Sequence, residues 1–379
     1  MKVKILFIFG TRPEAIKLAP LIKLFKDHCS RFETKICITS QHKSMLKQVL
    51  NLFNIVPDYD LKIMKKNQSL EYISSKTLEK LSEVFHQNKP DLIFVQGDTT
   101  TVMTASMAAF YQRIKIAHIE AGLRSYNKYS PFPEEINRVV TSHLADFHFA
   151  PTQQAKRNLL NEGICEENIW VTGNTVIDAL FLTLKMVKQN EDSYLKYFQQ
   201  KGIKFDRNVI LVTGHRRENF GKGFQNICNA LLKIANEDIE IIYPVHLNPN
   251  VQKPVNQILS NRNNIHLIKP LSYDKLVFLM KKSYLILTDS GGIQEEAPSL
   301  GKPVLVMRDV TERPEGIEAG TAKLVGTNKD NIVTNTLKLL NDLNIYKKMS
   351  IVNNPYGNGR ASEYILGILN KITEKDINK

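Results

Sequence analysis

The sequence predicts an α/β protein with parallel sheets in two domains. Short runs of Ile, Val, Leu and Phe alternate with longer helical patterns along the whole chain, and these runs are continuously apolar. Continuous apolar runs are typical of parallel strands that helices cover on both faces. The length of 379 residues points to two domains, because it exceeds what one hydrophobic core usually serves.

Ten runs are predicted to be strands. In the first half of the chain they span residues 3–9, 33–38, 91–96, 114–119 and 146–149. In the second half they span residues 208–212, 239–243, 265–268, 284–288 and 303–306. Helices are expected between them, since apolar residues recur near helical spacing at Leu70, Ile73, Leu78, Leu81 and Phe85, and at Leu276, Leu279 and Met280.

The domain boundary is expected shortly before residue 190, where the strand signal lapses, which gives domains of 1–175 and 176–360. The first strand of each half ends in Gly-x-Arg, as Gly10-Thr11-Arg12 and Gly214-His215-Arg216. Ligands of open α/β sheets bind beyond the carboxyl ends of the strands, so we expect two similar sheets facing a central cleft. A C-terminal helix within 361–379 either completes the first domain or finishes the second.

Composition limits the classes of partner. The net charge of +13 raises the question of nucleic acid, but the lysines are scattered instead of clustered. Several arginines follow predicted strands, where a small phosphorylated ligand would bind: Arg12, Arg138, Arg216, Arg217 and Arg313. We therefore expect a small-molecule ligand and no nucleic acid.

The cysteines and the apolar segments indicate the compartment. Four cysteines show neither metal-site spacing nor a disulfide pattern, and they are predicted to be reduced thiols in a cytoplasmic protein. The N-terminus enters a strand after two residues without the regions of a signal peptide. No apolar stretch approaches the length that crosses a bilayer, so a soluble protein without membrane contact is expected.

A phosphate-binding turn is predicted after the apolar run 284–288. The segment Asp289-Ser290-Gly291-Gly292 links that strand to a helix. Helix N-termini favour anions, and glycines let the backbone approach a phosphate closely. Arg12 lies at the start of another helix after the first strand, with Pro13 suited to its first turn. Two such strand ends suggest one diphosphate held between two domains.

Carboxylates at two further strand ends are candidate catalysts. Asp98 follows the strand 91–96, where helix capping and catalysis are equally good interpretations. Glu120 follows the next strand, and both carboxylates cannot cap one helix. Glu134 and Arg138 lie one helical turn apart and are expected on one face, where a surface salt bridge is the alternative to a site role.

Histidines follow two strands of the second half. His215 is expected to titrate near neutrality and to face the first domain, and His246 offers a similar, weaker case. No His and Asp/Glu set has zinc spacing, so no metal is predicted. Neither Gly-x-Gly-x-x-Gly after the first strand nor the Gly-x-x-x-x-Gly-Lys-Ser/Thr loop is present, so no cofactor is predicted, and a nucleotide-sugar enzyme fits best.

Seven blocks of sequence resemble one enzyme family when they are taken together. They are Gly10-Thr11-Arg12-Pro13-Glu14-Ala15-Ile16-Lys17, Gly97-Asp98-Thr99-Thr100, His118-Ile119-Glu120-Ala121-Gly122-Leu123-Arg124, Pro133-Glu134-Glu135-Ile136-Asn137-Arg138, Thr213-Gly214-His215-Arg216-Arg217-Glu218-Asn219, Asp289-Ser290-Gly291-Gly292-Ile293-Gln294-Glu295-Glu296-Ala297-Pro298 and Thr311-Glu312-Arg313-Pro314-Glu315. They are similar to the bacterial non-hydrolysing UDP-N-acetylglucosamine 2-epimerases and follow the family's order over nearly the whole chain.

The resemblance implies a homodimer of chains with two Rossmann-like domains of the glycosyltransferase-B type. It implies that UDP-GlcNAc and UDP-ManNAc are interconverted through elimination of UDP to a 2-acetamidoglucal, supplying ManNAc units for cell-surface polysaccharide. The implied catalytic residues are Asp98, Glu120, Glu134 and His215. The implied substrate-binding residues are Arg12, Lys17, Arg138, His246, Leu271, Leu276, Ser290, Gly291, Gly292, Glu296 and Arg313.

The family pattern also implies a second, activating UDP-GlcNAc site that includes Gln41 and His42. Asn67 stands where some relatives carry an arginine, and the sequence leaves activation open. Leu276 occupies a place where an aromatic residue often borders the uracil, so Leu271 and backbone groups are expected to contact uridine. Three alternatives stay open: a hydrolysing epimerase, a retaining glycosyltransferase of the same fold, and a non-catalytic UDP-sugar sensor.

Overall fold

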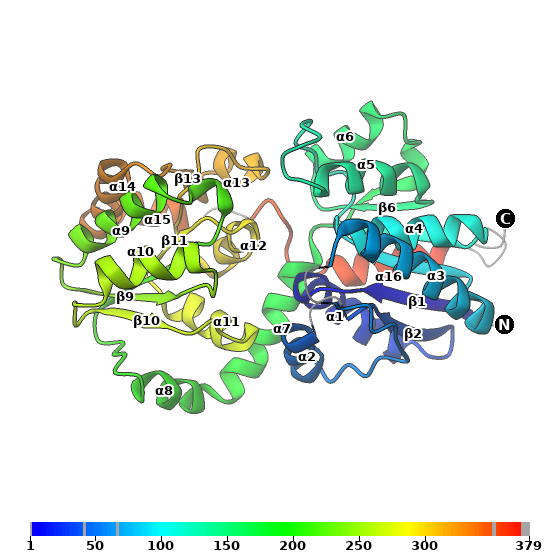
Figure 1. The fold of residues 1–379 in the computed structure, drawn as a ribbon, viewed down its shortest axis with the longest axis horizontal. Helices are drawn as coiled ribbons and strands as arrows, with labels where there is room; N and C mark the ends of the chain where they lie inside the picture. Colours follow the sequence, from blue (N-terminus) through cyan, green and yellow to red (C-terminus); the bar gives the residue numbers. More distant parts are fainter. Residues whose placement is uncertain (1, 41–42, 66–67, 351–353, 373–379) are drawn as a thin grey trace. The chain divides into compact units, whose positions relative to one another are not determined.

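The chain divides into two compact units. The computed structural model describes residues 2–40, 43–65, 68–350 and 354–372. The first unit comprises residues 1–179 together with 356–379, and the second comprises residues 180–355. Each unit has one sheet with helices on it, so the predicted α/β class with two parallel-sheet domains is confirmed (Figure 1).

The sheet of the first unit has seven strands in the order β3-β2-β1-β4-β5-β6-β7, and all neighbours are parallel. The strands are β1 (Val3–Phe9), β2 (Phe32–Ile38), β3 (Tyr59–Asp60), β4 (Leu92–Gln96), β5 (Lys115–Ile119), β6 (Phe147–Ala150) and β7 (Ile169–Val171). The helices are α1 (Arg12–Asp27), α2 (Lys43–Leu52), α3 (Leu70–Asn88), α4 (Thr100–Tyr111), α5 (Glu134–Leu144), α6 (Gln153–Asn161), the short η1 (Glu166–Asn168), the first turns of α7 (Thr175–Gln189) and α16 (Ala361–Lys371).

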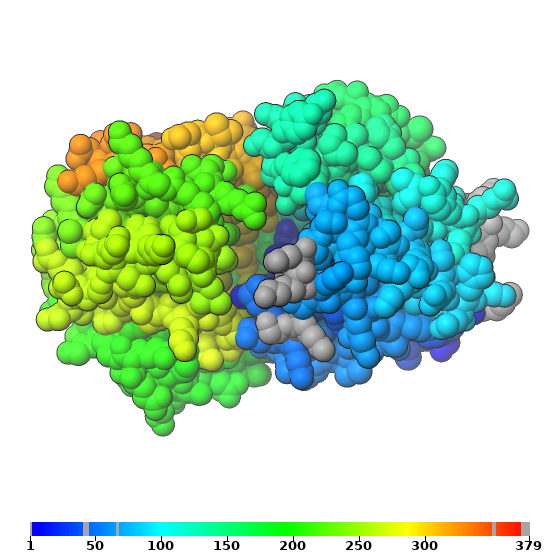
Figure 2. Space-filling model, viewed as in Figure 1, coloured from blue at the N-terminus to red at the C-terminus, as the bar shows by residue number. Residues whose placement is uncertain are grey.

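Successive strand residues bury opposite faces of this sheet, as the continuous apolar runs require. Leu6 and Ile8 of β1 join a cluster with residues of α3 and α4. Phe7, which lies between them, stacks on Phe94 and meets Phe25 of α1 on the other face. In Figure 2 side chains of α3 lie at the surface of the first unit, while residues such as Ile73, Leu81 and Phe85 of the same helix are buried.

The C-terminal helix α16 belongs to the first unit. It packs on α1, and Arg31 donates to the carbonyl oxygens of Leu369 and Ile372 at 3.3 and 3.2 Å. Its first turn is capped by Asp178 of α7, which accepts from the backbone N–H of Ala361 and Ser362 at 3.2 and 2.7 Å. These contacts fix the returning chain on α1 and α7 (Figure 1).

The sheet of the second unit has six parallel strands in the order β10-β9-β8-β11-β12-β13. The strands are β8 (Asn208–Thr213), β9 (Ile239–Pro244), β10 (Ile265–Ile268), β11 (Leu285–Thr288), β12 (Val304–Val306) and β13 (Ala322–Leu324). The helices are α8 (Glu191–Gln199), η2 (Arg217–Asn219), α9 (Lys222–Ile234), α10 (Pro249–Leu259), α11 (Tyr273–Lys282), α12 (Gly291–Glu296), η3 (Ala297–Leu300), α13 (Pro314–Glu318), α14 (Lys329–Asn341) and α15 (Leu343–Ser350).

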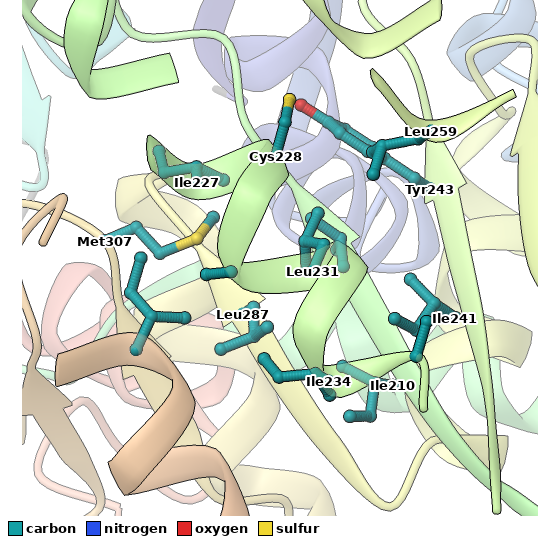
Figure 3. Close-up of a cluster of buried hydrophobic side chains, with 14 of the residues drawn as sticks. Ile210, Ile227, Cys228, Leu231, Ile234, Ile241, Tyr243, Leu259, Leu287 and Met307 are labelled. Carbon is teal, nitrogen blue, oxygen red and sulfur yellow. The ribbon is translucent and has the colours of Figure 1, made fainter. Parts of the chain in front are cut away.

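One face of the second sheet forms a closed apolar core with α9, α10 and α14. Figure 3 shows α9 residues Ile227, Leu231 and Ile234 directed at strand residues such as Ile210 and Leu287. Ile234, Ile210 and Leu287 are completely buried. Close packing of this core fixes the strands and therefore the points at which the loops leave their carboxyl ends.

The ten predicted strands are present within one residue of their predicted ends, and three further strands were missed. The missed strands β3, β7 and β13 have two or three residues each and lie at the sheet edges. Runs that short carry no apolar signal of their own. None of the helices in the described part of the chain is long and apolar enough to cross a membrane.

The strand order places the loops that carry the candidate site residues where the order of each sheet reverses. In the first sheet the order reverses between β1 and β4, and in the second it reverses between β8 and β11. Connections diverge to opposite faces at such a switch point, which leaves a crevice outside the carboxyl ends of the two strands. Asp98, His215 and Ser290 lie in the loops after three of these strands, and Arg12 begins the helix that follows β1.

Candidate active site

The loop after β1 is held by Glu14, which lies on the first turn of α1. Its Oε2 accepts from the backbone N–H of Gly10 at 3.1 Å and of Thr11 at 2.6 Å, and its Oε1 accepts from the hydroxyl of Thr99 at 2.7 Å. Burial raises the pKa of Glu14, against these hydrogen bonds. The carboxyl group thereby joins the loops after β1 and β4 and positions the first turn of α1, which carries Arg12.

Asp98 is not the N-cap residue of α4, which was one of the two interpretations of its position. Thr99 is the residue that caps α4, since its hydroxyl accepts from the N–H of Val102 at 3.3 Å. The Asp98 side chain is about one-third exposed, at 34%, and lies 3.8 Å from Nη1 of Arg138. Its backbone carbonyl is held by the side-chain amide of Asn137 at 2.9 Å.

Desolvation is the main reason why the pKa of Asp98 is raised. Arg138 and Lys17 oppose that shift, whereas the negative charges of Glu120 and Glu134 add to it. A carboxyl group with a raised pKa can release and accept a proton closer to neutral pH than an ordinary aspartic acid can. The first unit therefore places a proton carrier with a raised pKa among four other charged candidates.

Arg138 pairs with other carboxylates and does not form the surface salt bridge with Glu134 that was the alternative to a site role. Arg138 pairs with Glu135 at 3.4 Å and with Asp98 at 3.8 Å, and its side chain is only 4% exposed. Residues three apart on a helix are neighbours just as residues four apart are, and the buried side of α5 carries Glu135. The Nε of Arg138 makes no hydrogen bond within the described part of the chain. Arg138 thus faces the site and is no surface residue.

Glu120 follows β5 in a left-handed backbone conformation with φ of 66°. Its Oε2 accepts from Nζ of Lys17 at 2.5 Å and from the side-chain amide of Gln96, and its Oε1 accepts from the amide of Asn174 at 3.3 Å. Positive φ is uncommon for a residue with a side chain, and such conformations persist where the surroundings hold them. Glu120 is only 5% exposed, so Lys17 compensates a buried charge.

The glycine turn of the second unit follows β11 as predicted. Ser290 precedes α12, and its N–H is held by the hydroxyl of Thr288 at 2.9 Å. A Cβ added to Gly291 would lie 2.5 Å from Nη1 of Arg313, so the guanidinium lies directly against the turn. The turn and the arginine, 22 positions apart in sequence, therefore bring backbone and guanidinium N–H donors together, which suits an anion.

Arg313 is oriented by two carboxylates that the sequence analysis did not single out. Its Nε donates to Oε1 of Glu295 at 2.5 Å, and Glu312 lies 4.0 Å from its Nη1. Burial alone would raise the pKa of Glu312, but Arg313, Arg308 and Arg216 lower it to about 2. Glu312 is therefore an ionised anchor at the centre of three guanidinium groups.

His215 lies beside Asp289, which organises the whole loop after β8. The buried carboxylate of Asp289 accepts from the N–H groups of His215 at 2.9 Å and of Arg216 at 2.9 Å, and from the amide of Asn219 at 3.2 Å. Nδ1 of His215 lies 3.5 Å from Oδ1 of Asp289, and the ring stacks on His246 with centroids 5.4 Å apart. The structure thus joins both histidines that the sequence proposed.

Burial lowers the pKa of His215 below its usual 6.5, although Asp289 opposes the shift. Arg216 and His246 lower it further. The lowered pKa favours the neutral imidazole at neutral pH.

The remaining predicted contacts lie at the same edge of the second sheet. Glu296 ends α12 and accepts from the hydroxyl of Tyr273 at 2.5 Å. Leu271 is buried after β10, and Leu276 is half-buried on α11. Gln41 and His42 lie outside the described residues, as does Asn67.

Sequence reasoning missed the residues that hold the candidates in place. Those that contact a predicted site residue include Gln96, Asn174, Tyr273, Asp289, Glu295 and Glu312. Asp289 had a signal, because it directly follows a buried strand within the phosphate turn. Asn174 had none, since 54 positions separate it from Glu120. In the described part of the chain no cluster of His, Cys, Asp and Glu could hold a metal ion.

Comparison with known proteins places these features in one family. A family model described as UDP-N-acetylglucosamine 2-epimerase matches residues 26–370. UDP-N-acetylglucosamine 2-epimerase of Campylobacter jejuni is 54% identical over 377 residues, covering 98% of this chain and 98% of the relative. The enzyme of the same name from Escherichia coli strain K12 is 54% identical over 373 residues, covering 97% and 98%.

Solved structures agree with the sequence comparisons. The crystal structure of UDP-GlcNAc 2-epimerase from Neisseria meningitidis, bound to UDP-GlcNAc, is 51% identical and superposes with a TM-score of 0.93. The match covers 97% of this chain and 100% of that one. With the acids of the first unit and the glycine turn of the second in the family's order, this chain belongs to the UDP-N-acetylglucosamine 2-epimerase family.

Proposed function

We propose that this protein interconverts UDP-GlcNAc and UDP-ManNAc without hydrolysing either. The carrying observation is the pair of carboxyl groups at the ends of β4 and β5, where Asp98 has a raised pKa beside the lysine-bound Glu120. Two acid–base groups suit a reaction that removes a proton from one face of a carbon and returns one to the other. The Neisseria relative was solved with UDP-GlcNAc bound, which supports this substrate class.

The chemistry requires the departure of UDP. The hydrogen on C2 of the sugar has no adjacent carbonyl, so its removal has to accompany cleavage of the bond between C1 and the β-phosphate oxygen. The electrons of the C2–H bond form a C1=C2 double bond, and the phosphate oxygen leaves with the electrons of the C1–O bond. The products are UDP and 2-acetamidoglucal. Re-addition of the phosphate oxygen to C1, with a proton delivered to the opposite face of C2, gives the epimer.

The first unit supplies the proton carriers in this proposal. Asp98 and Glu120 exchange the C2 proton, and Glu134 assists or orients at the start of α5. Lys17 lies against Glu120 and Arg138 lies near Asp98. These cations allow the two carboxyl groups to lie close together in their ionised forms. The order of base and acid is open between the two carboxyl groups.

The second unit binds UDP in this proposal. Ser290, Gly291 and Gly292 offer backbone N–H groups to the diphosphate, and Arg313 stabilises the charge that grows on it as the C1–O bond breaks. His215 is neutral in the free protein and becomes an imidazolium beside the leaving phosphate. Glu296 accepts hydrogen bonds from the ribose hydroxyls. Leu271 and Leu276 border the uracil. A diphosphate contact by Arg12 stays a prediction of the family resemblance.

Incubation with UDP-GlcNAc in D2O tests the proposal. We expect deuterium at C2 of both nucleotide sugars and an equilibrium mixture that is reached from either one. NMR follows the C2 proton and the anomeric signals of both sugars. Unchanged protium at C2 contradicts the proposed function.

Two alternatives give different products in the same experiment. A hydrolysing epimerase releases free N-acetylmannosamine and UDP. A retaining glycosyltransferase leaves C2 untouched and transfers the sugar to an added acceptor. Either product pattern as the main outcome would replace the proposal.

Several finer points stay predictions of the sequence and its family resemblance. They are a homodimeric assembly, a cytoplasmic location, the supply of ManNAc units to a cell-surface polysaccharide, and the activating site at Gln41 and His42. Size-exclusion chromatography with light scattering tests the first of these.

A further inference from the structure

Asn174 uses three groups at the start of α7. Its side-chain amide donates to Oε1 of Glu120 at 3.3 Å, and its side-chain oxygen accepts from the N–H of Val176 at 3.0 Å. Its backbone N–H donates to the carbonyl oxygen of Tyr356 at 2.8 Å. Asn174 is only 2% exposed, so its side chain is enclosed by protein. Its amide nitrogen faces Glu120 and its amide oxygen faces the N–H of Val176. The residue joins Glu120, the first turn of α7 and the returning chain.

The returning chain passes α7 in backbone contact. Gly173 has φ of 85°, and a Cβ added there would lie 3.2 Å from the carbonyl oxygen of Tyr356 and 3.3 Å from Cα of Gly357. Gly357 has φ of 121°. Two glycines therefore let the chain segments before Asn174 and after Tyr356 touch, which seats the Asn174 backbone firmly. The chain leaves the first unit after residue 179 and returns to it at residue 356. Asn174 and Tyr356 therefore lie close in sequence to these two crossing points.

Glu120 needs such support because of its own backbone. Its left-handed φ of 66° directs a buried carboxylate away from the ordinary path of a strand end. Lys17 and Gln96 hold one carboxylate oxygen, and a hydrogen bond to one oxygen leaves the carboxylate plane able to rotate. The Asn174 amide holds the other oxygen and fixes that plane.

We propose that Asn174 is a positioning residue for the epimerisation, which orients the Glu120 carboxylate and couples it to the first turn of α7. The inference rests on the proposed function, in which Glu120 exchanges the proton at C2. Asn174 itself touches no reacting atom. A misoriented carboxylate slows proton transfer while substrate binding is retained, because near-attack geometry contributes to the chemical step.

Asn174→Asp is the matched test. Aspartate has the same shape, keeps an oxygen for the N–H of Val176 and keeps the backbone N–H to Tyr356. It replaces the donor to Glu120 by a second carboxylate. Other titratable groups that interact with Glu120 are Lys17 on α1, Asp98 after β4 and His118 on β5. Against this background a new carboxylate raises the pKa of Glu120 by like-charge repulsion.

We expect kcat at pH 7 to fall on the order of tenfold or more, since a hydrogen bond to a charged group is lost, with KM changed less than about threefold. The acidic limb of the pH–rate profile moves to higher pH, so part of kcat returns above pH 8. Asn174→Ser, which keeps a hydroxyl near Val176 and adds no charge, is expected to lower kcat without moving the profile.

Asp178→Asn is the control, four residues after Asn174 on α7. It weakens the cap of α16 without touching Glu120, so we expect a lower midpoint of thermal unfolding and an unchanged pH profile. If Asn174→Ser keeps the kcat of the unmodified protein, or if Asp178→Asn reproduces the pH shift, the inference is overturned.

A readout without substrate separates this inference from the proposed function. The 13C-carboxyl signal of Glu120, assigned by its loss in Glu120→Gln, is followed by pH titration in the unmodified protein and in Asn174→Asp. Upward displacement of the Glu120 titration in the variant supports the inference even if the protein does not exchange the C2 proton. Coincident titration curves overturn it even if the protein is an active epimerase.

Discussion

Gly291→Ala should weaken UDP binding through Arg313 and leave the fold intact. The new Cβ would lie 2.5 Å from Nη1 and 2.7 Å from Cζ of the guanidinium, whereas ordinary contact begins at 3.4 Å. The guanidinium therefore has to move by about 1 Å, because the backbone of a packed core yields less than a side chain does. That motion disturbs the 2.5 Å bond to Glu295 and the position that we assign to the diphosphate.

The expected loss follows from one charged hydrogen bond. Such a bond contributes about 1.5–3 kcal/mol, which corresponds to roughly 10- to 150-fold in the dissociation constant of UDP. Stability should change much less, since alanine favours the helical backbone over glycine by about 1 kcal/mol and this opposes the strain of the displaced arginine. Gly291 has no positive φ, so its backbone accommodates alanine.

Titration calorimetry with UDP and thermal unfolding measure the two effects. Gly367→Ala is the control, because it makes the same exchange inside α16 and its Cβ meets nothing within 4 Å. We expect this control to bind UDP normally and to unfold at the same or a higher temperature. Binding by Gly291→Ala within threefold of the unmodified protein would refute the assignment of Arg313 to the diphosphate.

Three further predictions concern titrating groups. Asp98→Asn should reduce deuterium exchange at C2 by at least about 100-fold with UDP affinity within threefold, as is expected for a lost acid–base group; comparable exchange would remove Asp98 from the mechanism. UDP affinity should rise as pH falls from 8 to 6, because the pKa of His215 lies below 6.5 in the free protein and a bound diphosphate favours its protonation; calorimetry in buffers of different ionisation enthalpy measures the proton uptake, and an equal uptake by His215→Gln would count against this role. Acid should destabilise the fold, since burial lowers the pKa of His118 to about 4 and of His148 to about 3. The unfolded chain binds more protons, so this stability is complete above pH 6.5 and is lost as pH falls toward these values; urea unfolding should show a shallower pH dependence in His148→Phe, and an unchanged slope would contradict the assignment.

The fold was largely predictable because its signals are local. Ten apolar runs marked ten strands to within one residue, since a strand buried on both faces has to be apolar throughout. The turn at Ser290 and Gly291 was recognisable from glycine after a strand. Edge strands of two or three residues, such as β3 and β13, escaped because most of their stabilisation comes from the neighbouring strand.

The candidate residues were predictable one by one, but their partners were not. Helical spacing placed Arg138 on the same face as Glu134, but it did not reveal that Arg138 pairs with Glu135 and Asp98. Asn174 and Glu120 meet across 54 positions of sequence. Hydrophobic periodicity reports on neighbours within a few residues, so it cannot predict a contact over this separation.

By itself, the sequence determined the class of fold, the strands and the chemical groups at their carboxyl ends, because hydrophobic pattern and turn chemistry act over a few residues. The tertiary structure alone decided the strand order, which puts Asp98 and Ser290 at the switch points of their sheets. It also decided the left-handed backbone of Glu120 and the amide that holds it. These features depend on packing between segments far apart in the chain, where loop closure and burial select one arrangement among many that the local pattern permits.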